Sequence, residues 1–140
     1  MATTIVLDTS VLIAGLRSPR GASYAVLRLL GSDSFRLSVS VPLVLEYEAV
    51  AKEHSREIGL SHAEIDDVVD YFCSVADHRK IYYLWRPFLR DPTDDMVLEL
   101  AVESGAEYIV THNLRDFQGI DQFGIEAVSP GVFLKRLKLT

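Results

Sequence analysis

Short, continuous apolar runs recur along this chain, separated by longer segments whose apolar residues follow a helical period. The first run is rich in β-branched residues and ends directly on Asp8. Runs of this kind are typical of strands that are buried on both faces, as in a parallel sheet. On this basis strands are expected over 4–7, 35–39, 81–85, 108–110 and 125–128.

The segments between these runs carry start and stop signals for helices. Thr9 or Ser10 is placed to cap a helix, Ser61 and Glu64 have the spacing of a capping box, and Asp91 precedes Pro92 as a cap precedes a first helical residue. Gly105 is expected to end the helix that Pro92 begins. Helices are therefore predicted over 11–16, 22–30, 42–55, 62–75, 92–104 and 130–137.

This alternation of strands and helices predicts an α/β fold with parallel strands and helices on both faces of the sheet. No segment reads as a linker, so one domain is expected over residues 1–140. The single cysteine excludes an internal disulfide and favours a reducing, cytoplasmic location. No signal peptide or membrane span is expected, because no apolar stretch approaches about 18 residues.

The net charge of −6 argues against a protein that binds nucleic acid by coating phosphates with Lys and Arg. It leaves open an enzyme that gathers carboxylates around a metal ion, because the ion then supplies the positive charge. Such an enzyme still needs some basic side chains near its site to hold a polyanion. Four arginines flank the polar segments and are candidate phosphate contacts: Arg17, Arg20, Arg90 and Arg115.

Polar side chains follow two of the expected strands. Asp8, Thr9 and Ser10 follow the first strand, while Thr111, His112 and Asn113, and then Asp116, follow the strand at 108–110. In open parallel sheets, ligands bind outside the carboxyl ends of the strands. If the two strands are neighbours, about 5 Å apart, their side chains can share one ion.

Two acids on apolar helices are candidates to join this site. Glu46 and Asp95 each lie among residues that a buried helix would carry, so each is expected at the rim or beside a partner such as a cation. Asp91 and Asp94 compete with Asp95 for the same role, although Asp91 also reads as a helix cap. A cluster of four carboxylates suits Mg²⁺ or Mn²⁺, which prefer oxygen ligands.

Three segments resemble the motifs of the PIN-domain family. IVLDTSVLIAGL at 5–16 looks like the first motif, SVSVPLVLEYEAV at 38–50 like the second, and RDPTDDMVLELAVESGAEYIVTHNLRDF at 90–117 like the third and fourth joined. The subgroup that the chain resembles most closely comprises bacterial and archaeal toxins of toxin–antitoxin pairs. This resemblance implies a three-layer α/β/α sandwich around a parallel sheet of four or five strands.

The resemblance also assigns roles to residues. The first, second and third family acids fall on Asp8, Glu46 and Asp95, which are expected to ligate the metal. The fourth falls on Asp116, because Asn113 stands where many members carry an acid. The hydroxyl positions that orient acids or ligand waters in the family fall on Thr9, Ser10 and Thr111.

The function that the resemblance implies is hydrolysis of phosphodiester bonds in single-stranded RNA by a Mg²⁺- or Mn²⁺-dependent endoribonuclease. Homodimers and inhibition by a small antitoxin protein are common among such toxins. Two other functions stay open. One is a non-catalytic PIN-like domain that binds RNA or protein, which Asn113 favours, and the other is a phosphoacceptor or phosphatase domain, for which the chain lacks a Lys near Thr111.

Overall fold

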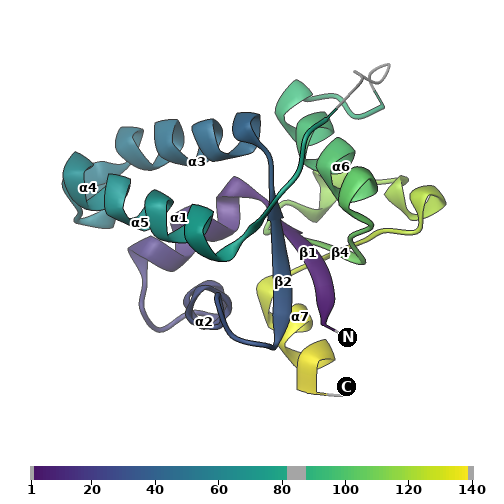
Figure 1. The fold of residues 1–140 in the computed structure, drawn as a ribbon, viewed down its shortest axis with the longest axis horizontal. Coiled ribbons are helices and arrows are strands. Elements are labelled where there is room, and N and C mark those ends of the chain that lie inside the picture. The colour runs from purple at the N-terminus through teal and green to yellow at the C-terminus, as the bar shows by residue number, and fades with distance from the viewer. Residues whose placement is uncertain (1, 82–87, 139–140) are drawn as a thin grey trace.

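The computed structural model describes residues 2–81 and 88–138, and within them a parallel sheet of five strands is flanked by helices (Figure 1). The strands are β1 (Thr3–Leu7), β2 (Phe35–Val39), β3 (Asp77–His78), β4 (Tyr108–Val110) and β5 (Glu126–Val128). The helices are α1 (Thr9–Arg17), α2 (Ala22–Arg28), α3 (Val41–Glu53), α4 (Ser55–Ile58), α5 (His62–Val75), α6 (Pro92–Ser104) and α7 (Pro130–Lys138), with 3₁₀ turns η1 (Leu114–Phe117) and η2 (Ile120–Phe123).

The strand order β3-β2-β1-β4-β5 places β1 at the centre of the sheet. The chain adds β2 and β3 on one side of β1 and then crosses to add β4 and β5 on the other. The order therefore reverses between β1 and β4, and such a reversal is where ligands bind in open α/β sheets. Leu7 pairs with Val110 in the register, so the next residues of the two strands, Asp8 and Thr111, emerge side by side.

Helices cover both faces of the sheet, as the sequence predicted. Ile5, Val6 and Leu7 are all fully buried, which requires cover on both sides because successive strand residues point to opposite faces. In Figure 1, α6 lies on the opposite side of β1 and β2 from α1 and α5, and α6 packs against β1, β2 and β4. The expected α/β/α layering is confirmed.

Most of the local signals act as predicted. Asp91 caps α6 as expected, by accepting from the Thr93 amide at 2.8 Å. At the start of α3, the Ser40 hydroxyl accepts from the Leu43 amide. Gly105 ends α6 in the left-handed conformation, with φ of 68°. The cap predicted for α1 was wrong: Asp8 occupies the N-cap position, and Thr9 and Ser10 lie in the first turn.

Two short elements were not predicted. Helix α4 has only four residues and strand β3 only two, too few to give a hydrophobic period. The strand expected over 81–85 falls largely on residues 82–85, which lie outside the described residues.

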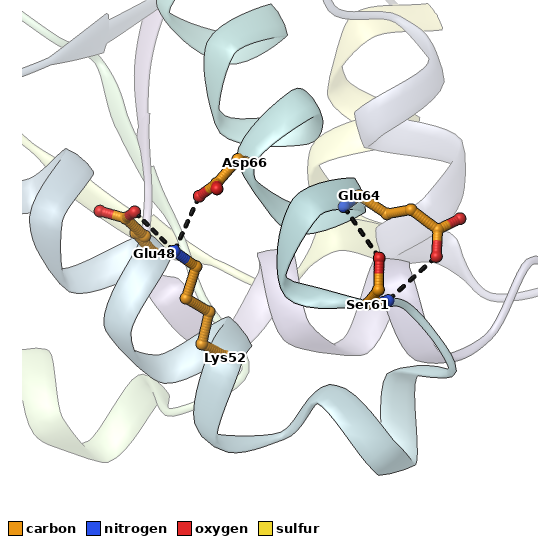
Figure 2. Close-up of polar contacts among 5 residues, drawn as sticks. All are labelled: Glu48, Lys52, Ser61, Glu64 and Asp66. Atoms are coloured by element: carbon orange, nitrogen blue, oxygen red, sulfur yellow. Dashed lines mark hydrogen bonds and ion pairs between the residues drawn. The ribbon is translucent and has the colours of Figure 1, made fainter.

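Helices α3 and α5 are joined by polar contacts at their surface (Figure 2). The Lys52 ammonium of α3 contacts Glu48 at 2.9 Å and Asp66 of α5 at 2.8 Å. The capping box of α5 is complete: Ser61 accepts from the Glu64 amide, and Glu64 accepts from the Ser61 amide. Of these contacts, the one between Lys52 and Asp66 joins α5 to α3, the helix that carries Glu46.

In the parts of the chain that the structure describes, no helix combines the length and the apolar character that crossing a membrane requires.

Candidate active site

Asp8 is the most firmly positioned acid of the site. It is 5% exposed, and its backbone amide donates to the Val110 carbonyl at 3.0 Å, which extends the β1–β4 ladder by one residue. Its Oδ2 accepts from Ser10 Oγ at 2.8 Å and from Thr111 Oγ1 at 2.7 Å. Although Asp8 is the N-cap of α1, its side chain makes no capping bond. The carboxylate is thus oriented by two hydroxyls rather than used to cap the helix.

The same two hydroxyls are themselves oriented by the segment after β4. Thr111 Oγ1 accepts from the Asn113 amide at 2.9 Å, and Ser10 Oγ accepts from the His112 amide at 3.2 Å. Because each hydroxyl accepts from a backbone amide, its proton is directed to Asp8. The polar ends of β1 and β4 therefore form one connected network, as their adjacency predicted.

A second support for Asp8 comes from Tyr47, which the sequence did not single out. Tyr47 is fully buried on α3, and its hydroxyl donates to the carbonyl of Leu7, the residue before Asp8, at 2.6 Å. Burial, and then the charge of Asp8, raise the pKa of Tyr47 well above its usual value, so the phenol stays a donor. The available signal was a tyrosine on the apolar helix that carries Glu46, since a buried tyrosine needs a polar partner.

A cavity of about 550 Å³ opens at this end of the sheet. Polar residues from α1, α3, the start of α6 and the segment after β4 line it. The carboxyl groups among its lining residues are Asp8, Glu46, Asp91, Asp94 and Asp116. Four elements that are distant in sequence thus bring acids to one cavity.

These acids repel one another. Burial, followed by the charges of Asp8, Asp116, Asp91 and Asp95, raises the pKa of Asp94 to about 7. Burial, followed by the charges of Asp8, Asp91 and Glu53, raises the pKa of Glu46. The charge of Asp8 thus contributes to the raised pKa of Glu46 on α3 and also to that of Asp94 on α6.

The structure places Asp94 in the cavity lining, whereas Asp95, the residue expected as the third acid, is not among the described residues that line it. Asp95 is 7% exposed, and its Oδ1 accepts from the amides of Phe88 and Leu89 at 3.2 and 2.8 Å. Successive residues of a helix point about 100° apart, and here Asp94 faces the cavity while Asp95 points toward the chain before α6. Asp95 instead ties the chain before α6 to the helix.

The remaining polar residues that the sequence proposed also lie around the cavity. Asp116 and Asn113 line it and are exposed, while Asp91 lines it and caps α6. Thr9 lines it as well, with a buried hydroxyl that has no hydrogen-bond partner within the described residues. Asp116 lies in the 3₁₀ turn η1, and its amide donates to the carbonyl of Asn113, the N-cap of that turn.

His112 is held to α2 by a contact that the sequence did not suggest. Its Nε2 lies 2.6 Å from the hydroxyl of Ser23, which is 4% exposed. The imidazole lines the cavity, so Ser23 sets its orientation there. No local pattern predicts a pair separated by 89 residues.

Of the four arginines proposed as phosphate contacts, Arg17 lines the cavity. Arg20, Arg90 and Arg115 are exposed and are not among the described residues that line it. Arg17 also contacts Glu57 of α4 at 3.5 Å, with both side chains more than half exposed.

The oxygen donors suit a hard divalent cation. Within the described residues, no three His, Cys, Asp or Glu side chains lie close enough together to hold one ion. Mg²⁺, however, is commonly held by one or two carboxylates plus water and substrate phosphate. Burial, and then the neighbouring negative charges, raise the pKa values of Glu46 and Asp94, and a bound cation would favour the ionised form of both.

Comparison with known proteins places this arrangement in a family. The family model described as "PIN domain" matches residues 4–115. The chain belongs to the PIN-domain family. PIN domains are generally nucleases, and PIN nucleases generally use divalent metals.

Similarity to solved structures agrees with this membership at the level of the fold. One match is the structure described as VapBC2 from Rickettsia felis bound to a DNA fragment from their promoter. It has a TM-score of 0.62 and 14% identity, and the match covers 91% of this PIN domain and 98% of that chain. No curated protein matches the sequence.

Proposed function

We propose that this PIN domain is an endoribonuclease that hydrolyses phosphodiester bonds of single-stranded RNA and depends on Mg²⁺ or Mn²⁺. The observation that carries the proposal is the setting of Asp8. Two hydroxyls hold one of its oxygens, and Glu46, Asp94 and Asp116 line the same cavity. An oriented, buried carboxylate among others that repel it is costly to fold and is expected where a cation binds.

Asp8, Glu46 and Asp94 are the residues that would hold the ion, and Asp116 with Asn113 would complete the oxygen set. When bound, Mg²⁺ or Mn²⁺ supplies Lewis acidity, lowers the pKa of water and offsets phosphate charge. The contribution of the chain is to keep the acceptor oxygens in place. Ser10 and Thr111 fix the Asp8 carboxylate, and Asp91 and Asp95 shape the start of α6, from which Asp94 projects.

The test is cleavage of single-stranded RNA with Mn²⁺ or Mg²⁺ by the wild type and by Asp8→Asn. The wild type is expected to cleave, and EDTA or the substitution to reduce cleavage at least about 100-fold. Arg36→Gln is a matched control, because Arg36 is exposed, pairs with Asp77 at the surface and is not among the described residues that line the cavity. Equal cleavage by the wild type and Asp8→Asn would reveal a contaminant and remove the support for the proposal.

A non-catalytic PIN domain that binds RNA or protein is the second candidate. Asn113 in place of an acid favours it, as does the lack of three described acids at ligating distance. Calorimetric titration of the wild type with Mn²⁺ separates the two functions. Heat that disappears in Asp8→Asn supports the nuclease, whereas no detectable binding supports the second candidate.

We further propose a small antitoxin protein as a partner, because the fold is similar to that of a VapBC2 structure and the acidic cavity attracts a basic peptide. A short reading frame beside the gene, whose product co-purifies with this chain and blocks cleavage, is the expected finding. A homodimer stays a prediction, which light scattering of the purified protein tests.

A further inference from the structure

The cavity at the active site continues as a trough between α1 and α3. Each helix lines it with residues spaced three or four positions apart, which is the spacing of one helix face. The lining residues are Thr9, Ser10, Ile13, Ala14 and Arg17 from α1, and Glu46, Val50 and His54 from α3 and its C-cap. The trough therefore follows both helices away from the carboxyl ends of β1 and β2.

The character of the lining changes in the same order on both sides. Ser10 and Glu46 lie at the acidic end, Ala14 and Val50 form an apolar middle, and a basic residue ends each stripe. By helical rise, the backbone of Arg17 lies about 13 Å from that of Asp8. The basic end is therefore too far from the acids for one phosphate group to contact both.

The two basic residues lie at the same end of the trough. Arg17 contacts Glu57, and Glu57 follows His54 by only three residues in the chain. His54 is partly buried, and its Nδ1 lies 3.0 Å from the Val50 carbonyl, so Nδ1 is the donor and Nε2 of the neutral ring is an acceptor. Arg17 is therefore the donor for a phosphate at this end. The Arg17–Glu57 contact is long and exposed, so a stronger acceptor can displace it.

We propose that Arg17 binds a second phosphate of the RNA strand whose cleaved phosphodiester lies at the acidic end. The inference rests on the proposed function, because it assigns the acidic end to the cleaved bond. The apolar middle accommodates a sugar or base between the two phosphates. A guanidinium forms strong, paired hydrogen bonds to phosphate, and it offsets the repulsion that an acidic cavity exerts on RNA.

RNA fits this charge order better than a protein segment does. A basic peptide would be attracted by the acids but repelled by Arg17, whereas a nucleic acid strand has a negative charge at regular intervals. Glu57 then acts as a competitor that holds Arg17 in the free protein.

The experiment measures the affinity of a short, fluorescently labelled single-stranded RNA by anisotropy in Ca²⁺ over a series of NaCl concentrations, with intact RNA verified afterwards. Arg17→Gln should weaken binding about tenfold. It should also reduce the slope of log affinity against log salt by about 0.7, the value for one phosphate contact on a single strand. Arg36→Gln, which removes a similar exposed ion pair away from the cavity, should match the wild type, and Glu57→Gln should bind roughly twofold more tightly.

A second series places a neutral methylphosphonate at each position of the RNA in turn. For the wild type, the substitution at one position away from the cleaved bond should weaken RNA binding. For Arg17→Gln, the same substitution should not weaken binding any further. Equal binding by Arg17→Gln and Arg36→Gln would overturn the proposal, and so would loss of a protein partner by Arg17→Gln with RNA affinity unchanged. If the wild type binds RNA in Ca²⁺ but does not cut it when Mn²⁺ or Mg²⁺ replaces Ca²⁺, the nuclease proposal fails, yet a selective loss in Arg17→Gln still supports the phosphate subsite.

Discussion

Thr111 Oγ1 donates to Asp8 Oδ2 at 2.7 Å, across the junction where the strand order of the sheet reverses. The two residues are 103 positions apart, yet they adjoin because β1 and β4 pair in parallel up to Leu7 and Val110. This bond links the first and last motifs of the family in one network, and it makes the orientation of Asp8 depend on the β4 end of the chain.

The first prediction concerns that bond. Thr111→Val keeps the shape of the fully buried side chain but removes the donor, so Asp8 retains only Ser10. We expect the rate of RNA cleavage to fall about tenfold or more, because a misplaced carboxylate loses its geometry for the ion. Thr111→Ser, which restores the hydroxyl, should recover most of the activity. Steady-state kinetics of both variants provide the measurement. Equal activity of Thr111→Val and Thr111→Ser would contradict the role given to the hydroxyl.

The second prediction separates two adjacent acids. Asp94→Asn should strongly reduce Mn²⁺ binding and cleavage, because Asp94 lines the cavity. Asp95→Ala removes the acceptor of two backbone amides, so it should lower the free energy of unfolding by about 1.5–3 kcal/mol. Calorimetry with Mn²⁺ and urea unfolding test the pair. The opposite pattern, with metal binding lost only in the Asp95 variant, would restore Asp95 as the third acid.

The structure shows where sequence reasoning succeeded. The strand ends, the capping signals and the adjacency of Asp8 and Thr111 follow from local patterns and from the rule that ligands bind at the carboxyl ends of parallel strands. Asp8 could be placed because a strand end fixes both its position and its direction.

The choice between Asp94 and Asp95 could not be made from the sequence. The two differ by one helical step, and the deciding contacts come from the amides of Phe88 and Leu89, in a segment with no predicted structure. Tyr47 and Ser23 were missed for a similar reason, because their partners are a strand carbonyl and a histidine distant in the chain. Contacts of this kind depend on the tertiary packing and leave no periodic signal.

The third prediction follows from the pKa of Asp94, which is raised from its usual 3.8 to about 7 in the folded, metal-free protein. A carboxyl group with a raised folded pKa favours folding below its unfolded pKa, and that contribution is lost as the pH rises to the folded value. The metal-free wild type should therefore lose stability between about pH 4 and pH 7 relative to Asp94→Asn. Thermal unfolding in EDTA at pH 5 and pH 8 measures the difference.

Mn²⁺ should reverse this effect, because a bound cation favours the ionised acids. At pH 8 the melting temperature of the wild type should rise with Mn²⁺, and that of Asp94→Asn should rise much less. A difference between the two proteins in EDTA that is the same at pH 5 and pH 8 would contradict the pKa assigned to Asp94.

The last prediction concerns Tyr47, whose hydroxyl donates to the Leu7 carbonyl from a fully buried position. Tyr47→Phe removes this donor without opening a large cavity, and we expect the free energy of unfolding to fall by about 1–2 kcal/mol. Because Leu7 precedes Asp8, cleavage should fall as well, by more than the loss of folded protein accounts for. Lys52→Met, on the exposed side of the same helix, serves as the control, since it removes the contacts to Glu48 and Asp66 without touching β1. Urea unfolding, together with cleavage rates normalised to folded protein, gives the result. A Tyr47→Phe variant that is less stable but fully active per folded molecule would show that the bond supports the fold alone.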